Sequence, residues 1–160
     1  MTVTIDTIIL DVRNAIQALN RSIAGVQAPP IQQLPTSIDT TNGQPFAMTL
    51  AGTGESWQKG AGYSQGTRML RVLVYLDPVA QSDIPSHELD GSLLMQQFLN
   101  LYIKSTNTPL FNPGPYQATI ESGPTGPHVN DSGLTPTLRF GGREFVGFEI
   151  QVPIRWQGPQ

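Results

Sequence analysis

The chain contains no cysteine among its 160 residues. Disulfide scaffolds, thiolate nucleophiles and thiolate metal sites are therefore excluded, and the composition fits assembly in a reducing cytoplasm. Basic residues are also few, because nine Lys and Arg stand against twelve Asp and Glu, for a formal charge of -3. Nucleic-acid binding needs a cluster of positive charge, so we expect no direct nucleic-acid recognition.

Charge of either sign is scarce. Charged residues make up 13% of the chain, whereas about 25% is usual in soluble domains. Charged residues are depleted in the cores of interfaces, and a small net charge favours association. The composition therefore indicates a surface that neighbouring subunits cover, with a neutral, loop-rich monomer as the alternative. The N-terminal apolar pattern, residues 5–23, is interrupted by charges, so we expect neither a signal peptide nor a membrane span.

Two long segments are rich in Gly, Pro, Ser, Thr and Asn but are almost uncharged. Residues 51–67 include five glycines, and residues 105–137 include six prolines and four glycines. Connections longer than about 12 to 15 residues are uncommon in compact domains and tend to be functional. Both segments keep apolar residues that disordered tails usually lack. We therefore predict two long extended loops that contact another protein subunit. The residues expected at these contacts are Trp57, Lys59, Tyr63, Leu110, Phe111 and Tyr116.

Two amphipathic helices are predicted from apolar residues at helical spacing. The first spans about residues 4–24, with Gly25 as its stop, and its apolar stripe is expected to cover a sheet. The second begins near Ser86 and ends at Lys104. Its predicted apolar positions are Leu89, Leu93, Leu94, Phe98, Leu101 and Tyr102.

Strands are predicted before and after the second helix. Residues 38–41 and 46–50 are typical of a β-hairpin around Asn42-Gly43, a dipeptide that suits a type I′ turn. Residues 68–76 form the most apolar strand, which we expect to be central and covered on both faces.

The C-terminal part predicts a short strand at residues 116–121 and a longer one that follows Gly141-Gly142. This last strand runs to about Trp156, and its wetter second face indicates a position near an edge. The whole chain, residues 1–160, is therefore expected to be one α+β domain. A mixed or antiparallel sheet is flanked by two α-helices and carries the long extended loops.

No set of residues has the spacing of a catalytic or metal site. Ser86, His87 and Glu88, with Asp83, could support acid-base chemistry, but Ser and Glu at a helix start already have capping roles. His128 is far from His87 and lies in no metal-binding motif. We therefore expect no enzymatic activity, no cofactor and no metal.

The order of the predicted parts carries a resemblance. An amphipathic helix is followed by a proline-spaced leader that ends in Leu34-Pro35, a hairpin and a glycine-rich segment. An arginine-led strand (RMLRVLVYL), a second helix and a closing strand preceded by the run GGREF complete the order. This layout resembles the tail terminator proteins of long-tailed bacteriophages over most of the chain, through short patterns and not through a catalytic motif.

The resemblance implies a subunit of a hexameric ring at the head-proximal end of the phage tail tube. Such a ring stops tube polymerisation and joins the tail to head-completion, or neck, proteins. Its partners would be further copies, the tail tube protein and a neck protein, at the head-tail junction of a virion assembled in the host cytoplasm. The alternatives are a tail tube or head-completion subunit, a glycan-binding module that stacks sugars on Trp57 and Tyr63, and a hydrolase that uses His87.

Overall fold

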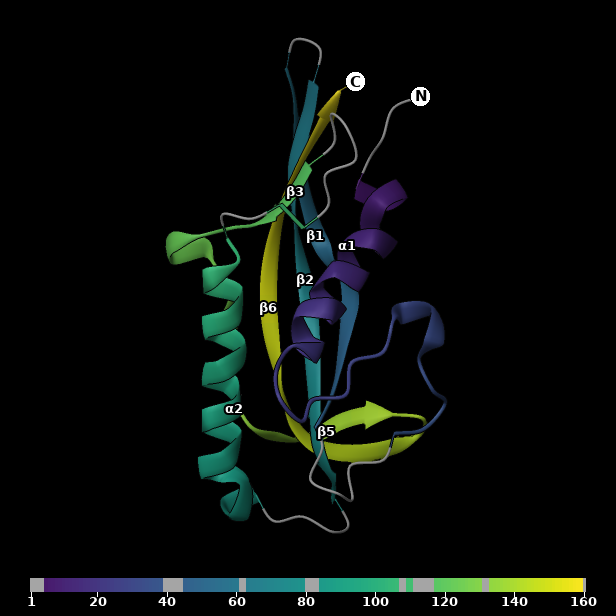
Figure 1. Cartoon of the computed structure of the whole chain (residues 1–160), viewed down its shortest axis with the longest axis vertical. Coiled ribbons are helices and arrows are strands. Elements are labelled where there is room, and N and C mark those ends of the chain that lie inside the picture. Colours follow the sequence, from purple (N-terminus) through teal and green to yellow (C-terminus); the bar gives the residue numbers. More distant parts are fainter. Residues whose placement is uncertain are drawn as a thin grey trace.

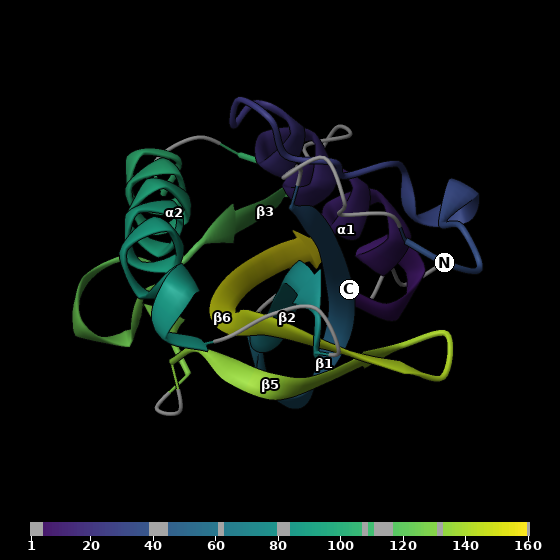
Figure 2. The same ribbon diagram turned by 90° about the horizontal axis from the view of Figure 1, so that it is seen from below.

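The computed structural model describes residues 5–38, 45–60, 63–79, 84–106, 109–110, 117–130 and 133–159. In this part of the chain, two helices pack on one face of a curled antiparallel sheet (Figure 1; Figure 2). The predicted α+β class is confirmed. The helices are α1 (Ile5–Arg21) and α2 (Ile84–Lys104), and the strands are β1 (Phe46–Gly60), β2 (Tyr63–Pro78), β3 (Gln117–Ile120), β4 (His128–Val129), β5 (Thr135–Phe140) and β6 (Arg143–Pro159).

The closing strand β6 lies in the middle of the sheet, so the prediction of an edge position is wrong. One side of β6 pairs with β2 from Phe145 to Pro159. Along its other side lie β5, β4 and β3, three short strands. The polar residues that indicated an edge instead bond to neighbouring segments. Glu149 accepts hydrogen bonds from Arg71 Nε (2.6 Å) and Asn130 Nδ2 (2.8 Å).

The segment predicted as the first long loop, residues 51–67, is also corrected. It forms the outer parts of β1 and β2, which pair as an antiparallel hairpin up to Gly60 opposite Tyr63. The predicted hairpin around Asn42-Gly43 is not confirmed, because β1 pairs with β2 and Ile38 lies in no strand. Residues 39–44 lie outside the described part of the structure. The second predicted loop contains β3, as expected, together with β4 and the start of β5.

Both helices lie where their apolar periodicity predicts. Helix α1 ends at Arg21, shortly before Gly25, whose φ is +82°. In α2, Phe98 and Tyr102 are fully buried as predicted, but Leu93 is 57% exposed. The buried stripe passes through Gly91 instead, because Leu134 packs against it: a Cβ at Gly91 would lie 3.0 Å from the Leu134 side chain.

The main core lies between the two helices and the sheet, and a smaller one lies on the opposite face. Strand β2 contributes to both cores. The prediction that this strand is covered on both faces is therefore confirmed for the part of β2 that lies at the smaller core. There, Tyr75 OH donates to Arg139 O at 3.1 Å. Burial raises the pKa of Tyr75 to about 12, against a smaller opposing effect of Arg71. The smaller core consists of Ile38, Phe46, Leu73, Tyr75 and Phe145.

A buried hydrogen-bond network joins both helices to the edge strand β1. Gln17, Asn20, Thr49 and Tyr102 take part, and each is 0% exposed. Tyr102 OH donates to Asn20 Oδ1, and Asn20 Nδ2 donates to Gln17 Oε1 at 3.1 Å. Thr49 Oγ1 donates to the same glutamine oxygen at 2.9 Å, and Gln17 Nε2 donates to Ala47 O at 3.1 Å. Burial raises the pKa of Tyr102 well above its ordinary value, so the hydroxyl remains a donor.

Replacing Asn20 by alanine should test this network. The substitution leaves the Tyr102 hydroxyl buried without its acceptor, and an unsatisfied buried polar group costs about 1 to 3 kcal/mol. With the cavity added, we expect Asn20→Ala to lower the free energy of unfolding by about 2 to 4 kcal/mol in urea titrations. Asn100→Ala, on the exposed face of α2, is the control and should change it by about 0.5 kcal/mol or less. Equal effects of the two substitutions would contradict the role of the network.

Candidate functional site

The outer parts of β1 and β2 extend past the helices (Figure 1), and the end of β6 pairs along the outer part of β2. We call residues 53–60 and 63–69 the hairpin arm. Arg13 Nε donates to Thr49 O at 3.0 Å, so Arg13 of α1 lies beside Thr49 of β1. From Arg13 back to Ile5 the helix rises about 12 Å, the length of roughly four strand residues. Helix α1 therefore begins about level with Thr53, and the arm lies beyond it.

Three of the predicted contact residues lie together in the arm. Trp57 pairs with Gly66, Lys59 pairs with Ser64, and Tyr63 is the first residue of β2. Their positions are on paired strands, not on the loop that the sequence predicted. The contact roles themselves stay predictions.

The predicted residues of the second segment divide between described and undescribed parts. Leu110 is partly buried against the main core, and its N–H donates to Ala118 O of β3 at 2.7 Å. Phe111 and Tyr116 lie outside the described residues. Leu110 is therefore attached to the subunit's own sheet, which does not favour the free contact residue that was predicted.

One row of residues across the sheet connects the two predicted segments. Trp57 pairs with Gly66, Gly66 with Trp156, and Trp156 with Ala118. The carbonyl of Ala118 then accepts the hydrogen bond of Leu110. The two segments, far apart in the sequence, thus lie level with each other at the two opposite edges of the sheet.

Trp156 is the central residue of this row, and the sequence predicted it only as one apolar residue of a strand. Its side chain is 4% exposed and belongs to the main core. Small residues, Gly66 and Ala118, pair with it on either side. Its indole nitrogen has no hydrogen-bond acceptor among the described residues. The flanking small residues are the sequence signal for this position, but only the pairing register shows that they face Trp156.

A β-bulge separates the arm from the part of β1 that packs on the core. The pairing register shifts between Leu50 and Thr53 and again between Thr53 and Ser56. Gly52 lies at the first shift with a φ of +66°, and an ideal Cβ there would be 1.7 Å from Met69 O. Only glycine fits this close approach, and bulges of this kind bend and twist a strand. Gly52 therefore sets the direction in which the arm leaves the core.

The outer face of α2 is a second uncharged surface. No charged residue occurs between Asp90 and Lys104, and two aliphatic side chains on this helix, Leu93 and Ile103, are 57% and 56% exposed. The other exposed residues of this face are Ser92, Gln96, Gln97 and Asn100. Uncharged surface with exposed aliphatic groups is typical of a protein contact.

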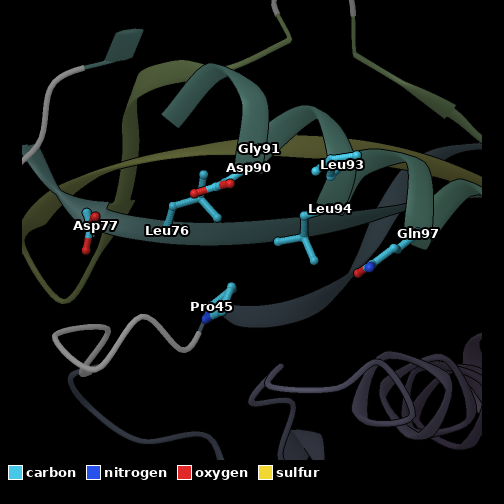
Figure 3. A pocket seen from close by; sticks show the side chains of 8 residues that line it. All are labelled: Pro45, Leu76, Asp77, Asp90, Gly91, Leu93, Leu94 and Gln97. Carbon is cyan, nitrogen blue, oxygen red and sulfur yellow. The ribbon is translucent and has the colours of Figure 1, made fainter. Parts of the chain in front are cut away.

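A shallow pocket of about 340 Å³ lies beside the N-terminal half of α2 (Figure 3). Pro45, Leu76 and Leu94 contribute apolar surface, and Asp77 and Asp90 contribute carboxylates. Among the described residues that line it, there is no histidine, and no nucleophile or basic group accompanies the two carboxylates. We therefore regard it as part of the surface around α2.

The candidate catalytic residues do not form a site in the described structure. Asp83 and the side chains of Ser86, His87 and Glu88 lie outside the described part. His128 has its two ring nitrogens 3.0 Å from Gly126 O and from Gln151 Oε1, which places it in local contacts. Among the residues that are described, no three His, Asp or Glu lie close enough together to hold a metal ion.

The chain was compared with known protein families and with known protein sequences. A search of protein-family models found no match, and neither did a search of curated protein sequences. No helix within the described ranges is long and apolar enough to cross a membrane.

The bulge can be tested with two glycines of similar φ. Gly52→Ala should lower the free energy of unfolding by about 2 to 4 kcal/mol, since strained φ and contact with a backbone carbonyl add together. Gly25 has a φ of +82° with nothing within 4 Å of an ideal Cβ, so Gly25→Ala should cost about 1 to 2 kcal/mol from the φ alone. Chemical denaturation measures both. A loss for Gly52→Ala no larger than that for Gly25→Ala would contradict the close approach at the bulge.

Proposed function

We propose that this chain is a non-enzymatic virion assembly protein of the tail terminator type. In this proposal its subunits form a ring, with six copies as the expected number, at the head-proximal end of a phage tail tube. The ring stops tube polymerisation and joins the tail to neck proteins. The protein assembles in the host cytoplasm and ends at the head-tail junction.

The hairpin arm is the observation that carries the proposal. The subunit has its own main core, in which residues of α1, α2, β2 and β6 are fully buried, and the arm reaches that core where Gly66 pairs with Trp156. Residues 51–67 carry only two charges, Glu55 and Lys59. A projecting and almost uncharged arm is costly for an isolated subunit, because open strand edges pair with other chains. It is suited to a subunit whose arm is covered after assembly.

The position of the second uncharged surface also supports a ring. The arm contains β1 and β2, whereas the exposed face of α2 lies on the side of the subunit away from α1 and β1 (Figure 2). A cyclic ring requires a head-to-tail contact between two different surfaces of each subunit. The arm and the outer face of α2 meet this requirement, with Trp57 and Leu93 as their large apolar residues.

The oligomeric state of the purified chain tests the proposal. Native mass spectrometry and negative-stain electron microscopy over a rising concentration series should show closed rings of about sixfold symmetry, the number that the resemblance implies. Trp57→Ala should reduce the fraction of rings, while Gln157→Ala at an exposed position of β6 should not. A chain that never exceeds a monomer or dimer, at any concentration, would contradict the ring. Glycan binding that is lost in Trp57→Ala would favour the glycan-binding alternative.

A further inference from the structure

The outward stripe of α2 has the spacing of a coiled-coil seam. Leu93, Gln96, Asn100 and Ile103 are exposed, and they follow one another at intervals of three, four and three residues. This alternation is that of the a and d positions of a heptad, which form the contact line between two packed helices. Helix α2 packs on the sheet with one stripe and thus presents a second one, these four residues, which we call the outer seam.

The outer seam belongs to a helix at the margin of the subunit. Both views place α2 on the side away from α1 and β1 (Figure 1; Figure 2). From Leu93 to Ile103 the seam rises about 15 Å along the helix. Asp90 and Lys104 lie just beyond its two ends, both are exposed, and neither forms an ion pair with another described residue. A matching surface therefore needs aliphatic groups at two ends, amides between them and opposite charges beyond.

A second copy of α2 in antiparallel orientation provides the aliphatic groups. A twofold axis at the level of Phe98 exchanges residues that lie equally far from it along the helix. Leu93 and Ile103 each lie five residues from Phe98, so Leu93 of each copy is opposite Ile103 of the other. Both side chains are more than half exposed in the subunit, and their contact removes apolar surface from water at both ends of the seam.

The amide groups of the seam match in the same register. Gln96 and Asn100 each lie two residues from Phe98, so they too are opposite each other. Within one copy, Gln96 Nε2 donates to Asn100 Oδ1 at 3.0 Å. A primary amide has both donors and an acceptor, so Asn100 Nδ2 of one copy can donate to Gln96 Oε1 of the other. A polar residue at an a position fixes the register of two helices at some cost in stability.

The charges at the two ends select the antiparallel orientation. Asp90 and Lys104 each lie seven residues from Gln97, next to the axis, so the three residues form one row beside the seam. The axis then brings Asp90 of each copy to Lys104 of the other. A parallel pair in the same register would instead bring like charges to the same end. Antiparallel helix dipoles favour the same choice.

We infer that two copies of the subunit form a twofold dimer through α2, packed antiparallel along the outer seam. Asp90 and Lys104 form an ion pair at each end, Leu93 contacts Ile103 next to it, and the amides bond at the centre. The contact is isologous, the commonest arrangement in protein dimers. One helix pair of about four turns buries less than the roughly 1,600 Å² of a standard interface, so we expect a Kd of micromolar or higher.

The inference does not rest on the proposed function, although the two meet at the same surface. In the proposed ring, the outer face of α2 contacts the arm of a neighbour, so the dimer must open before the ring closes. The dimer and the ring therefore compete, and the dimer is the associated state of the free chain.

Charge exchange tests the dimer directly. Asp90→Lys gives a chain with lysine at both ends of the seam, and Lys104→Asp gives one with aspartate at both ends. Asp11→Lys is the matched control, because Asp11 is exposed on α1 and the substitution changes the net charge by the same amount as Asp90→Lys. Sedimentation equilibrium at low ionic strength gives the dimer Kd, and circular dichroism melting checks that each variant folds.

Each single variant at the seam should raise the Kd of its homodimer about tenfold, since two ion pairs change from attraction to repulsion. The control should leave the Kd within about twofold of the wild-type value. An equimolar mixture of Asp90→Lys and Lys104→Asp chains should recover dimers, as heterodimers in which lysines meet aspartates. The double variant Asp90→Lys/Lys104→Asp should recover the homodimer.

Three results would overturn the inference: a wild-type chain with no dimer species, single variants with a Kd no higher than that of the control, or a mixture that stays monomeric. A failure of the ring gives a different pattern. In that case the charge-exchange series behaves as expected, but no species larger than the dimer forms at any concentration.

Discussion

The position of α1 against β1 is the constraint on which the rest of the structure depends. It is held by the buried network of Gln17, Asn20, Thr49 and Tyr102. Three of its hydrogen bonds join different elements, and the fourth, from Asn20 to Gln17, fixes the side chain that bonds to β1. Buried polar groups are costly without partners, so helices and edge strand keep one relative position. Because α1 begins about level with Thr53, that position also decides how much of the edge of β1 is covered. The hairpin arm is the part that remains.

Helical periodicity in the sequence predicted both helices well, because a helix with an apolar stripe is stable when that stripe packs on the apolar face of a sheet. It failed in detail at Leu93, since it could not detect that Leu134 packs against Gly91. The class of fold, the most apolar strand and the Gly141-Gly142 turn were predictable for similar reasons, and both glycines of that turn have positive φ.

The strands of the arm could not be predicted by the same reasoning. Their residues are mostly small or polar, with Trp57, Tyr63 and Met69 as the exceptions, so they lack the alternation that marks a half-buried strand. Within the arm β1 and β2 pair with each other, and β2 also pairs with β6. Because β6 lies far along the chain, this second pairing leaves no local signal in the sequence of the arm. The polar second face of β6 indicates an edge strand, but Glu149 on that face bonds to Arg71 and Asn130, which the sequence does not reveal. Trp57, Lys59 and Tyr63 stay predicted contact residues, and their register and common hairpin came only from the structure.

The central claim is that the core is complete in one subunit and that the arm is completed by other copies. Hydrogen exchange followed by mass spectrometry tests it most directly, on the dilute free chain and on the concentrated, associated chain. We expect peptides that cover residues 53–60 to exchange fast when dilute and several-fold more slowly when associated, because outward amides gain partners. Peptides that cover residues 70–74, inside the core, should be protected equally in both. Strong protection of residues 53–60 in the dilute monomer, or no change on association, would contradict the account.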